Sequence, residues 1–330
     1  MKILVTGGCG YIGSHVSRAL QQSNTRNEIY VIDRVLRDHT LLGVQGYLCA
    51  DFASDESLRF IGTVKPDVVV HCAADTLVGE SVADPAKYYH NNISRTVTLM
   101  TYLKDLVDKP LVLFSSSASV YGNPLAGQDV VETDLKLPIS PYGTSKYVVE
   151  RLLADYFTAY GMPSVCFRYF NAAGACPVTH DLGQEPGATH IVARVLEASL
   201  ANKAFTINGS NYDTPDGTCI RDYVHVWDIA LAHVRAAGFF DNYSPDASLR
   251  TNISLTLNLG TNTGVSNREI VDYVEQKYGL LFVNFGPKRP GDPARLIADA
   301  GNARKILGWE PVNSDIKQII DDAYKWYMKC

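Results

Sequence analysis

Residues 2–13 read KILVTGGCGYIG and combine a short apolar strand with a glycine-rich turn. Gly7, Gly10 and Gly13 have the spacing G-x-x-G-x-x-G, and an amphipathic helix is expected over 14–22. Such glycines let the backbone approach a pyrophosphate, while the helix N-terminus offers free amides and a positive dipole end. The turn therefore predicts a dinucleotide site, which also includes Tyr11 and Ile12.

Strands and helices alternate through the first half of the chain. Each expected strand is nearly continuous in Val, Ile and Leu, which is typical of parallel strands buried on both faces. We expect strands at 28–34, 47–51, 66–74, 111–117 and 164–174, and helices at 55–60, 85–106 and 142–160. The predicted fold class is α/β, a doubly wound, parallel Rossmann-like sheet with a smaller C-terminal α/β substrate lobe.

After about Asn171 this regular alternation ends, and a loop rich in Gly, Pro and polar residues leaves the sheet. Further helices are expected at 190–202, 227–240, 266–279 and 314–328, and strands at 205–209, 221–226 and 255–260. We expect two lobes. The dinucleotide-binding domain would comprise 1–175 together with 222–262, and the substrate lobe would comprise 176–221 and 263–330.

Asp33 ends the second expected strand, twenty residues after Gly13. A carboxylate there can accept hydrogen bonds from the ribose hydroxyls of NAD, and it would repel the 2′-phosphate of NADP. Arg34 and Arg37 favour the opposite choice, because a guanidinium pairs well with phosphate. The balance favours NAD as the cofactor.

The ends of the next two strands supply further candidate cofactor contacts. Asp51 and Phe52 could meet the adenine or could belong to a solvated turn, since loops at strand ends often carry function. Cys72, Ala73 and Ala74 end the fourth strand, where small side chains would allow the cofactor to approach. The Cys72 thiol fits a small packing residue better than a nucleophile.

A second motif lies between Ser115 and Lys146. Tyr142 and Lys146 are four residues apart on an expected helix, so they share one face. A cation beside a phenol favours the phenolate, which makes tyrosine usable as a base near neutral pH. Ser117, at the end of a buried strand, could hydrogen-bond the substrate oxygen from which the tyrosine removes a proton. Taken alone, Tyr-x-x-x-Lys also fits an ordinary amphipathic helix, because so short a motif recurs by chance.

Composition narrows the class of protein. Hydrophobic residues make up 46% of the 330 residues and charged residues 20%, as in globular proteins. No apolar run approaches the roughly 18 residues of a membrane span, and the first residues read as a strand, so we expect a cytoplasmic protein without membrane contact. The seven cysteines show no CxxC spacing, which favours reduced thiols. A net charge of −5 gives no basic face for nucleic acid, and the histidines show no metal-binding spacing.

Several segments together resemble a known family. They are TGGCGYIG (6–13), HCAADTLVGESV (71–82), SSSASVYG (115–122), SPYGTSK (140–146), RYFNAAGA (168–175) and DGTCIRDYVHV (216–226). These segments resemble the extended short-chain dehydrogenase/reductases and, within that superfamily, the UDP-glucose 4-epimerases. The glycine turn and Tyr-x-x-x-Lys mark only the superfamily, whereas the second, fifth and sixth segments are far more specific.

The resemblance implies a role for each matching residue. Tyr142 would be the base, Ser117 its partner at the sugar oxygen, and Lys146 would bind the nicotinamide ribose and lower the tyrosine pKa. Additional cofactor contacts would come from Asn91, Ser115 and Tyr169. The implied substrate contacts are Ser117, Tyr142, Phe170, Asn171, Arg221, Arg289, Asp292 and Leu296. Among these, both arginines would bind the UDP diphosphate and Asp292 the uridine ribose.

The resemblance also implies NAD-dependent 4-epimerisation of a UDP-hexose through a transient 4-keto intermediate. A homodimer is implied, joined through the helices at 85–106 and 142–160. Thr76 stands where some members carry lysine, and Arg34 replaces the asparagine that commonly follows the ribose-binding aspartate. Leu296 is smaller than the tyrosine of stricter members, so an N-acetylated sugar could enter. Arg221 could instead form an ion pair with Asp222.

Other functions stay open at this point. The chain could epimerise another UDP-sugar, such as an N-acetylhexosamine or a pentose, or it could be a nucleotide-sugar dehydratase. Dehydratases that resemble it carry Asp-Glu shortly after the strand-end serine or threonine, where this chain reads Ser-Ser-Ala-Ser. From a different class, it could be a dinucleotide-sensing regulatory protein. A sensor would have little need of Ser117, Tyr142 and Lys146 together.

Overall fold

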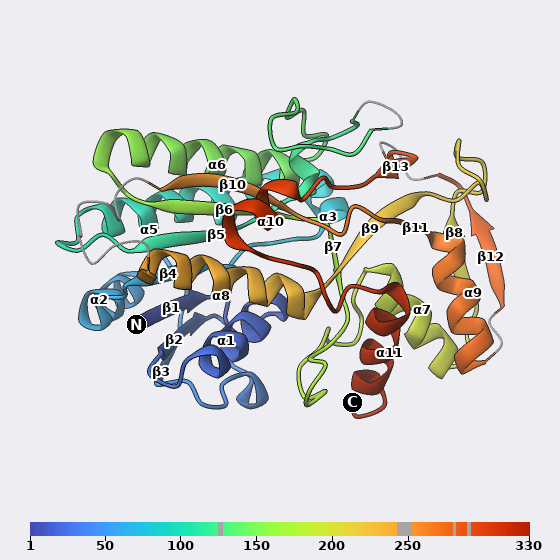
Figure 1. Ribbon diagram of the computed structural model, residues 1–330, viewed down its shortest axis with the longest axis horizontal. Helices are drawn as coiled ribbons and strands as arrows, with labels where there is room; N and C mark the ends of the chain where they lie inside the picture. Colours follow the sequence, from blue (N-terminus) through green and yellow to red (C-terminus); the bar gives the residue numbers. More distant parts are fainter. Residues whose placement is uncertain (125–127, 243–252, 280–281, 289–291) are drawn as a thin grey trace.

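The computed structural model describes residues 1–124, 128–242, 253–279, 282–288 and 292–330 (Figure 1). A seven-stranded sheet forms its centre, and all neighbouring strands in it pair in parallel. Across the sheet the order is β10 (Ser254–Leu259), β6 (Ser164–Tyr169), β5 (Leu111–Ser117), β4 (Val68–His71), β1 (Lys2–Thr6), β2 (Glu28–Asp33) and β3 (Gly46–Cys49). The predicted doubly wound parallel sheet is therefore confirmed.

Helices cover both faces of this sheet. Figure 1 shows α1 (Tyr11–Ser23) and α8 (Val226–Asn242) on one side, with α5 (Arg95–Lys104) and α6 (Pro141–Tyr160) on the other. Within β1, Ile3 and Val5 pack in the core cluster that contains α1 and α8. Leu4 packs in the opposite cluster, together with Ile61 of α2 (Asp55–Val64). Successive strand residues point to opposite faces, so continuous apolar strands are needed where both faces are buried.

Segments far along the chain complete the same core. β10 pairs with β6, and α8 packs against α1. Ala303 of α10 (Gly301–Leu307) also belongs to the α1–α8 cluster, as does Trp309, whose Nε1 donates to the Asp228 carbonyl at 2.7 Å. This part of 263–330 therefore packs on the large sheet, although the predicted division assigns it to the substrate lobe. The remaining lobe boundaries stay a prediction.

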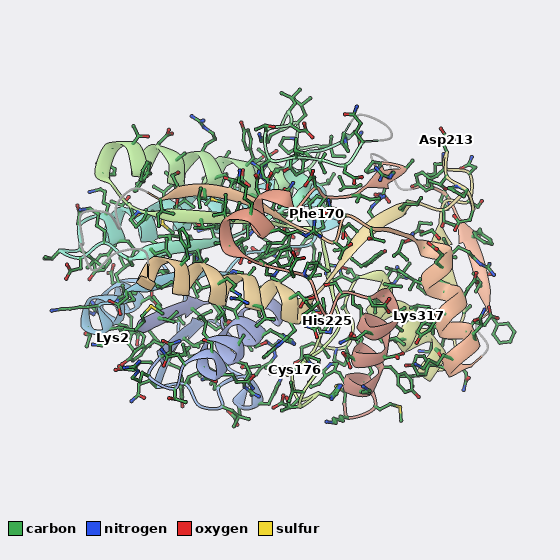
Figure 2. The ribbon with its side chains drawn as sticks, viewed as in Figure 1. Lys2, Phe170, Cys176, Asp213, His225 and Lys317 are labelled. Carbon is green, nitrogen blue, oxygen red and sulfur yellow. The ribbon has the colours of Figure 1, made fainter. Side chains whose placement is uncertain are left out.

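A second core cluster brings together α7 (Ile191–Leu200), α9 (Asn267–Tyr278) and α11 (Ile316–Tyr327). In its sheet, β9 (Ile220–His225) pairs with β7 (Asn171–Ala173), β11 (Gly264–Ser266) and β13 (Arg295–Leu296), while β8 (Phe205–Asn208) pairs separately with β12 (Val283–Gly286). Ser266 caps α9 through a reciprocal capping box with Glu269. The side chains between these elements are drawn in Figure 2.

Some elements differ from the sequence-based prediction. The expected strand at 164–174 is divided at Phe170 into β6 and β7, because β7 pairs with β9 instead of continuing in the large sheet. The expected helix at 85–106 consists of α4 (Pro85–Tyr88), a π-helical turn (Tyr89–Ser94) and α5. The short helices α3 (Val78–Ala83), η1 (Asp38–Thr40) and η3 (Ala118–Val120) were not predicted. Such short elements carry too few residues for a periodic pattern.

Candidate active site

The glycine turn lies where the strand order reverses, between β1 and its neighbours β2 and β4. Gly7 has a φ of 71°, and a Cβ atom there would meet the Ala73 nitrogen at 2.7 Å. At Gly13 a Cβ atom would overlap the Gly7 carbonyl oxygen, so only glycine fits at either position. Gly10 precedes α1, and among the described residues no side chain caps the first turn of that helix. This cradle of closely packed glycines and uncapped amides suits a pyrophosphate.

The residues around the turn complete a site that fits NAD. The Asp33 carboxylate accepts hydrogen bonds from the Cys9 amide at 2.9 Å and from the Val35 amide at 3.1 Å, which holds it beside the turn. Tyr11 lies in the first turn of α1, and its hydroxyl donates to the Gly174 carbonyl at 2.8 Å. Ile12 is half-buried against the main core. The structure thus places the predicted ribose-binding carboxylate next to the predicted pyrophosphate cradle.

The two arginines that could favour NADP have other partners. Arg37 donates to the Cys9 carbonyl at 2.9 Å, within the glycine turn itself. Arg34 extends toward Asp75, with 3.7 Å between guanidinium and carboxylate. Both guanidiniums are therefore directed at oxygen atoms of the protein, which agrees with an NAD site.

Asp51 and Phe52 lie at the end of β3 with their side chains engaged by the protein. The Asp51 carboxylate accepts from Arg95 Nε at 2.7 Å and from the Ala53 amide at 2.9 Å. Phe52 is buried, with its ring edge-on to His71 at a centroid distance of 5.0 Å. Contact of these two residues with the adenine stays a prediction.

The π-helical turn presents two adjacent asparagines to Asp75. Asn91 Nδ2 donates to the Asp75 carboxylate. Asn92 is buried and bonds both the amide and the carbonyl of Asp75, while its Nδ2 also donates to Ser145 of α6 at 3.0 Å. The resemblance implies a cofactor contact for Asn91 and gives no role to Asn92. The repeated asparagine was the available signal, but the face that each presents depends on the π-helical turn.

The start of α6 positions the Tyr-x-x-x-Lys pair. Ser140 caps the helix by accepting from the Gly143 amide at 3.1 Å. Lys146 donates from Nζ to the Ser115 carbonyl at 2.8 Å, and its ammonium lies 5.8 Å from the centre of the Tyr142 ring. Ser117, at the end of β5, accepts from the Ser119 amide at 3.2 Å. The structure thus brings together the three predicted catalytic residues from a strand end and a helix start.

Burial dominates the electrostatics of these groups. It raises the pKa of Tyr142, and a hydrogen bond with Ser117 opposes that rise. Burial also lowers the pKa of Lys146 to about 8. The lowering of the Tyr142 pKa by Lys146, whose ammonium lies 5.8 Å from the Tyr142 ring, stays a prediction. Ser117 is the neighbour that favours the phenolate here.

Polar side chains at the ends of β4, β5 and β6 are joined by hydrogen bonds. Ser115 Oγ lies 3.1 Å from Cys72 Sγ and 3.0 Å from the Tyr169 hydroxyl. Ala73 closes against the glycine turn, and Ala74 follows it in the loop after β4. Burial raises the pKa of the Cys72 thiol to about 11, so the thiol stays protonated. This agrees with a packing residue and not a nucleophile.

The predicted UDP-binding residues lie around β9. Arg221 has a buried side chain that forms an ion pair with Asp292 and donates to the Ile220 carbonyl at 2.7 Å. The alternative pair with Asp222 is wrong, because the buried Asp222 carboxylate accepts instead from the amide and hydroxyl of Thr261. Strand side chains alternate in direction, so neighbours in β9 meet different partners.

The other predicted substrate residues that the structure describes lie in β13, in β7 and at the junction of β6 and β7. Leu296 of β13 is half-buried and pairs in register with Arg221. Asn171 of β7 pairs in register with Tyr223, and Phe170 is buried at the junction of β6 and β7. Arg289 lies outside the described residues.

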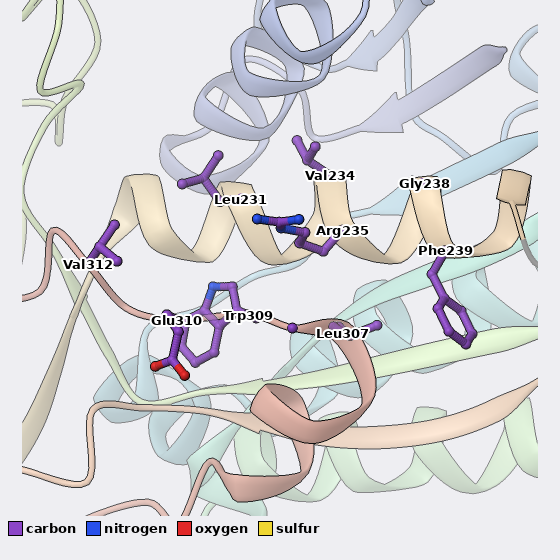
Figure 3. Close-up of a pocket in the computed structure, with 10 residues that line it drawn as sticks. Leu231, Val234, Arg235, Gly238, Phe239, Leu307, Trp309, Glu310 and Val312 are labelled. Atoms are coloured by element: carbon purple, nitrogen blue, oxygen red, sulfur yellow. The ribbon is translucent and has the colours of Figure 1, made fainter.

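A pocket of about 810 Å³ lies elsewhere, between α8 and residues 307–312 (Figure 3). It is lined by Leu231, Val234, Arg235, Gly238, Phe239, Leu307, Gly308, Trp309, Glu310 and Val312, none of which is a predicted site residue. In the described part of the chain no helix is long and apolar enough to cross a membrane, and no cluster of three His, Cys, Asp or Glu could hold a metal ion.

A doubly wound sheet with a dinucleotide cradle beside a Ser–Tyr–Lys group defines a nucleotide-cofactor enzyme. Residues 3–254 match the profile of the NAD dependent epimerase/dehydratase family, and the chain belongs to this family. NAD is its cofactor, as the acidic end of β2 predicts.

Curated relatives and solved structures agree with this assignment. The chain is 37% identical to the UDP-glucose 4-epimerase of Halalkalibacterium halodurans, over 99% of this chain and 96% of the relative. It is 39% identical to the UDP-glucose 4-epimerase of Azospirillum brasilense, over 98% of this chain and 91% of the relative. Its fold matches the Brucella ovis UDP-glucose 4-epimerase in complex with NAD with a TM-score of 0.89, at 36% identity over 98% and 97% of the two chains. The resemblance found in the sequence is confirmed.

Proposed function

We propose that the protein interconverts UDP-glucose and UDP-galactose by inverting C4 of the hexose. The observation that carries this proposal is the gathering of Ser117, Tyr142 and Lys146 beside the NAD cradle. The names of the relatives support the choice of a UDP-hexose. A solved structure from Bifidobacterium longum, at 31% identity over 100% of this chain and 98% of its own with a TM-score of 0.87, holds NAD+ and UDP.

Each of the three residues has a distinct task in this reaction. Tyr142 accepts the proton of the 4-hydroxyl and later returns it. Ser117 stabilises the phenolate, as its effect on the Tyr142 pKa indicates, and it can donate to the sugar oxygen. Lys146, anchored on the Ser115 carbonyl, supplies positive charge beside the base. Bound NAD supplies a hydride acceptor and donor for C4. Loss of the hydroxyl proton and of a hydride from C4 leaves a ketone, and return of the hydride to the opposite face of C4, with the proton returned to the oxygen, gives the epimer.

Inversion requires that the hexose turn over while UDP stays bound. Arg221 suits the diphosphate, because its planar guanidinium can donate paired hydrogen bonds to phosphate oxygens. Its ion pair with Asp292 holds that guanidinium in one orientation before substrate arrives. Binding of UDP would then redistribute these hydrogen bonds, with Asp292 turning to the uridine ribose. Arg289 is proposed as the second diphosphate contact.

The test is incubation with UDP-galactose and chromatographic separation of the products. UDP-glucose should appear until the two sugars reach a constant ratio. A product that has lost water would support a dehydratase instead, and absence of any product would exclude both enzymes. The assay is repeated with UDP-N-acetylgalactosamine, since half-buried Leu296 leaves more room than a tyrosine would. No turnover of that sugar would overturn the role proposed for Leu296.

A cytoplasmic homodimer is also proposed. Apolar side chains of α3, α5 and α6 are exposed, namely Val78, Val82, Val97, Val148 and Tyr160. A second copy of the chain would remove this apolar surface from water. Light scattering after size exclusion should give twice the mass of one chain, and Val97→Glu should shift the population toward monomer. A monomeric parent protein would refute the proposed dimer.

A further inference from the structure

A row of buried polar groups joins the strand ends of the NAD site to α8. It begins at Cys72 Sγ, 3.1 Å from Ser115 Oγ, which in turn lies 3.0 Å from the Tyr169 hydroxyl. The Tyr169 hydroxyl lies 2.9 Å from His233 Nε2, and His233 Nδ1 lies 2.9 Å from the Ile229 carbonyl oxygen. His233 is fully buried in α8, and no sequence motif marks it. The row therefore reaches from a side chain at the NAD site to a helix behind it.

The contact of His233 with the Ile229 carbonyl sets the direction of the hydrogen bond between Tyr169 and His233. The Ile229 carbonyl can only accept, so His233 Nδ1 must carry the hydrogen. Burial lowers the pKa of His233 to about 4, so Nε2 has no second proton at neutral pH. Tyr169 must then donate its only hydroxyl proton to Nε2. Tyr169 can then only accept from Ser115 Oγ, whose single proton is shared between the Tyr169 hydroxyl and Cys72 Sγ.

This direction distinguishes Tyr169 from Tyr142, the other tyrosine of the site. The proton of Tyr169 is directed into α8, and burial raises the pKa of Tyr169 well above its ordinary value. Tyr169 consequently stays neutral and presents only a lone pair to its surroundings. Tyr142 has no such acceptor in its described hydrogen bonds, and Ser117 favours its phenolate. Only Tyr142 is thereby available as the base.

The row also acts on Lys146. Ser115 is held at its side chain by Tyr169 and Cys72, and its main-chain carbonyl accepts from Lys146 Nζ at 2.8 Å. A shift of Ser115 would therefore move the ammonium that stands beside Tyr142. Chains of hydrogen bonds inside a protein are mutually reinforcing, so a loss at one end is felt along the row.

We propose that His233 is a positioning residue of this enzyme, which acts through Tyr169 and Ser115 to hold Lys146 and the nicotinamide end of the NAD site in place. The inference deepens the proposed function and rests on it. The plainer interpretation is that His233 only fills the core, with its hydrogen bonds satisfied.

A second histidine offers a matched control. His15 is also fully buried, lies in α1 and bonds through Nδ1 to the carbonyl four residues earlier, that of Tyr11, at 2.7 Å. No side-chain hydroxyl in the described part of the chain bonds its Nε2. His15 thus shares the burial and the helical contact of His233, but it contacts Tyr11 only through the main-chain carbonyl and the ring edge and bonds no tyrosine hydroxyl.

The experiment compares His233→Asn, His233→Gln and His15→Asn. Asparagine keeps a donor near the helix carbonyl but removes the acceptor at Nε2, whereas glutamine can place an oxygen there. NAD release is measured without sugar, and kcat and KM for UDP-galactose are expressed per bound NAD. We expect His233→Asn to lower kcat about tenfold with little change in KM, and to speed NAD release by a similar factor. His233→Gln should recover most of the loss, and His15→Asn should stay within about twofold of the parent.

The decisive variant is Tyr169→Phe combined with His233→Asn. If His233 acts through Tyr169, the double variant should be no slower than Tyr169→Phe alone. Additive losses, or a His15→Asn effect as large as that of His233→Asn, would overturn the proposal. Should the parent fail to turn over UDP-galactose, the proposed substrate would be wrong, while a His233-specific change in NAD release would still support the positioning role.

Discussion

Lys146 donates a hydrogen bond of 2.8 Å from Nζ to the main-chain carbonyl of Ser115. This bond joins the first turns of α6 to the end of β5, only two residues before Ser117. Lys146 also lies 5.0 Å from the Phe114 ring and 5.8 Å from the Tyr142 ring. The ammonium is thus held by the strand that carries Ser117 and by the helix that carries Tyr142, so the relative placement of all three side chains depends on how strand and helix pack.

Tyr142→Phe should reduce kcat by about 10²–10⁴-fold, because it removes the proton acceptor for the 4-hydroxyl. NAD content and UDP affinity should change little, since neither depends on the phenol oxygen. The measurement is steady-state turnover of UDP-galactose, with NAD quantified after denaturation. Tyr147→Phe, at the half-buried neighbouring tyrosine in α6, is the control. Retained turnover in Tyr142→Phe would refute the assignment of the base.

Ser117→Ala should move the pH dependence of kcat to higher pH. The hydrogen bond with Ser117 lowers the Tyr142 pKa, so its removal raises that pKa further. Because the phenolate is the active form, raising the pKa leaves less of it at any lower pH, and the rate falls about tenfold when the pKa rises by one. Ser117→Thr keeps a hydroxyl and should restore the parent profile. A profile that moves to lower pH in Ser117→Ala would contradict this role.

Arg221→Ala should raise the KM for the UDP-sugar by about 10–100-fold, which is the loss of roughly 1.5–3 kcal/mol in charge-assisted hydrogen bonds. NAD should be retained, because Arg221 is in β9 and the NAD cradle is at β1. UDP binding by calorimetry and bound NAD are both measured. Equal loss of UDP and NAD binding would indicate that the Arg221–Asp292 pair mainly supports the fold.

Glu150→Gln should destabilise the protein by about 3–5 kcal/mol, because it leaves a buried guanidinium without its counter-ion. Glu150 and Arg168 are both buried, joined by contacts of 2.9 and 2.6 Å, and Glu150 also accepts from Ser116. The measurement is chemical denaturation of the NAD-loaded protein. Arg151→Ala, which breaks the adjacent exposed pair with Asp155, should cost about 1 kcal/mol or less. Equal effects would refute the importance of burial.

Gly13→Ala should abolish NAD retention, because its new Cβ would collide with the Gly7 carbonyl oxygen and open the cradle. The protein should still be expressed folded, since alanine is a strong helix former at the start of α1. Bound NAD and circular dichroism are measured together. Gly238→Ala in α8 is the control, as a Cβ atom there meets nothing within 4 Å. Normal NAD content in Gly13→Ala would contradict the proposed approach of backbone and pyrophosphate.

Local sequence patterns were sufficient to predict the central sheet, the glycine turn and the cofactor of this protein. The continuous apolar strands indicated a parallel sheet, since only strands covered on both faces need such composition. The spacing of Gly7, Gly10 and Gly13 predicted a turn before a helix, and Asp33 predicted NAD. These inferences succeed because each depends on residues within one strand, turn or helix. Tyr142 and Lys146 likewise share a helix face by spacing alone.

Long-range packing accounts for the features that join distant segments. The partner of Arg221 is Asp292, not its neighbour Asp222, because adjacent strand residues point to opposite faces. Lys146 is held by Ser115, and burial, which no local pattern reveals, raises the pKa of Tyr142. His233 joins the NAD site only because α8 returns across the sheet to Tyr169. Residue type and local spacing established which chemistry the strand ends could carry, whereas the packing of strands and helices established which of those groups meet.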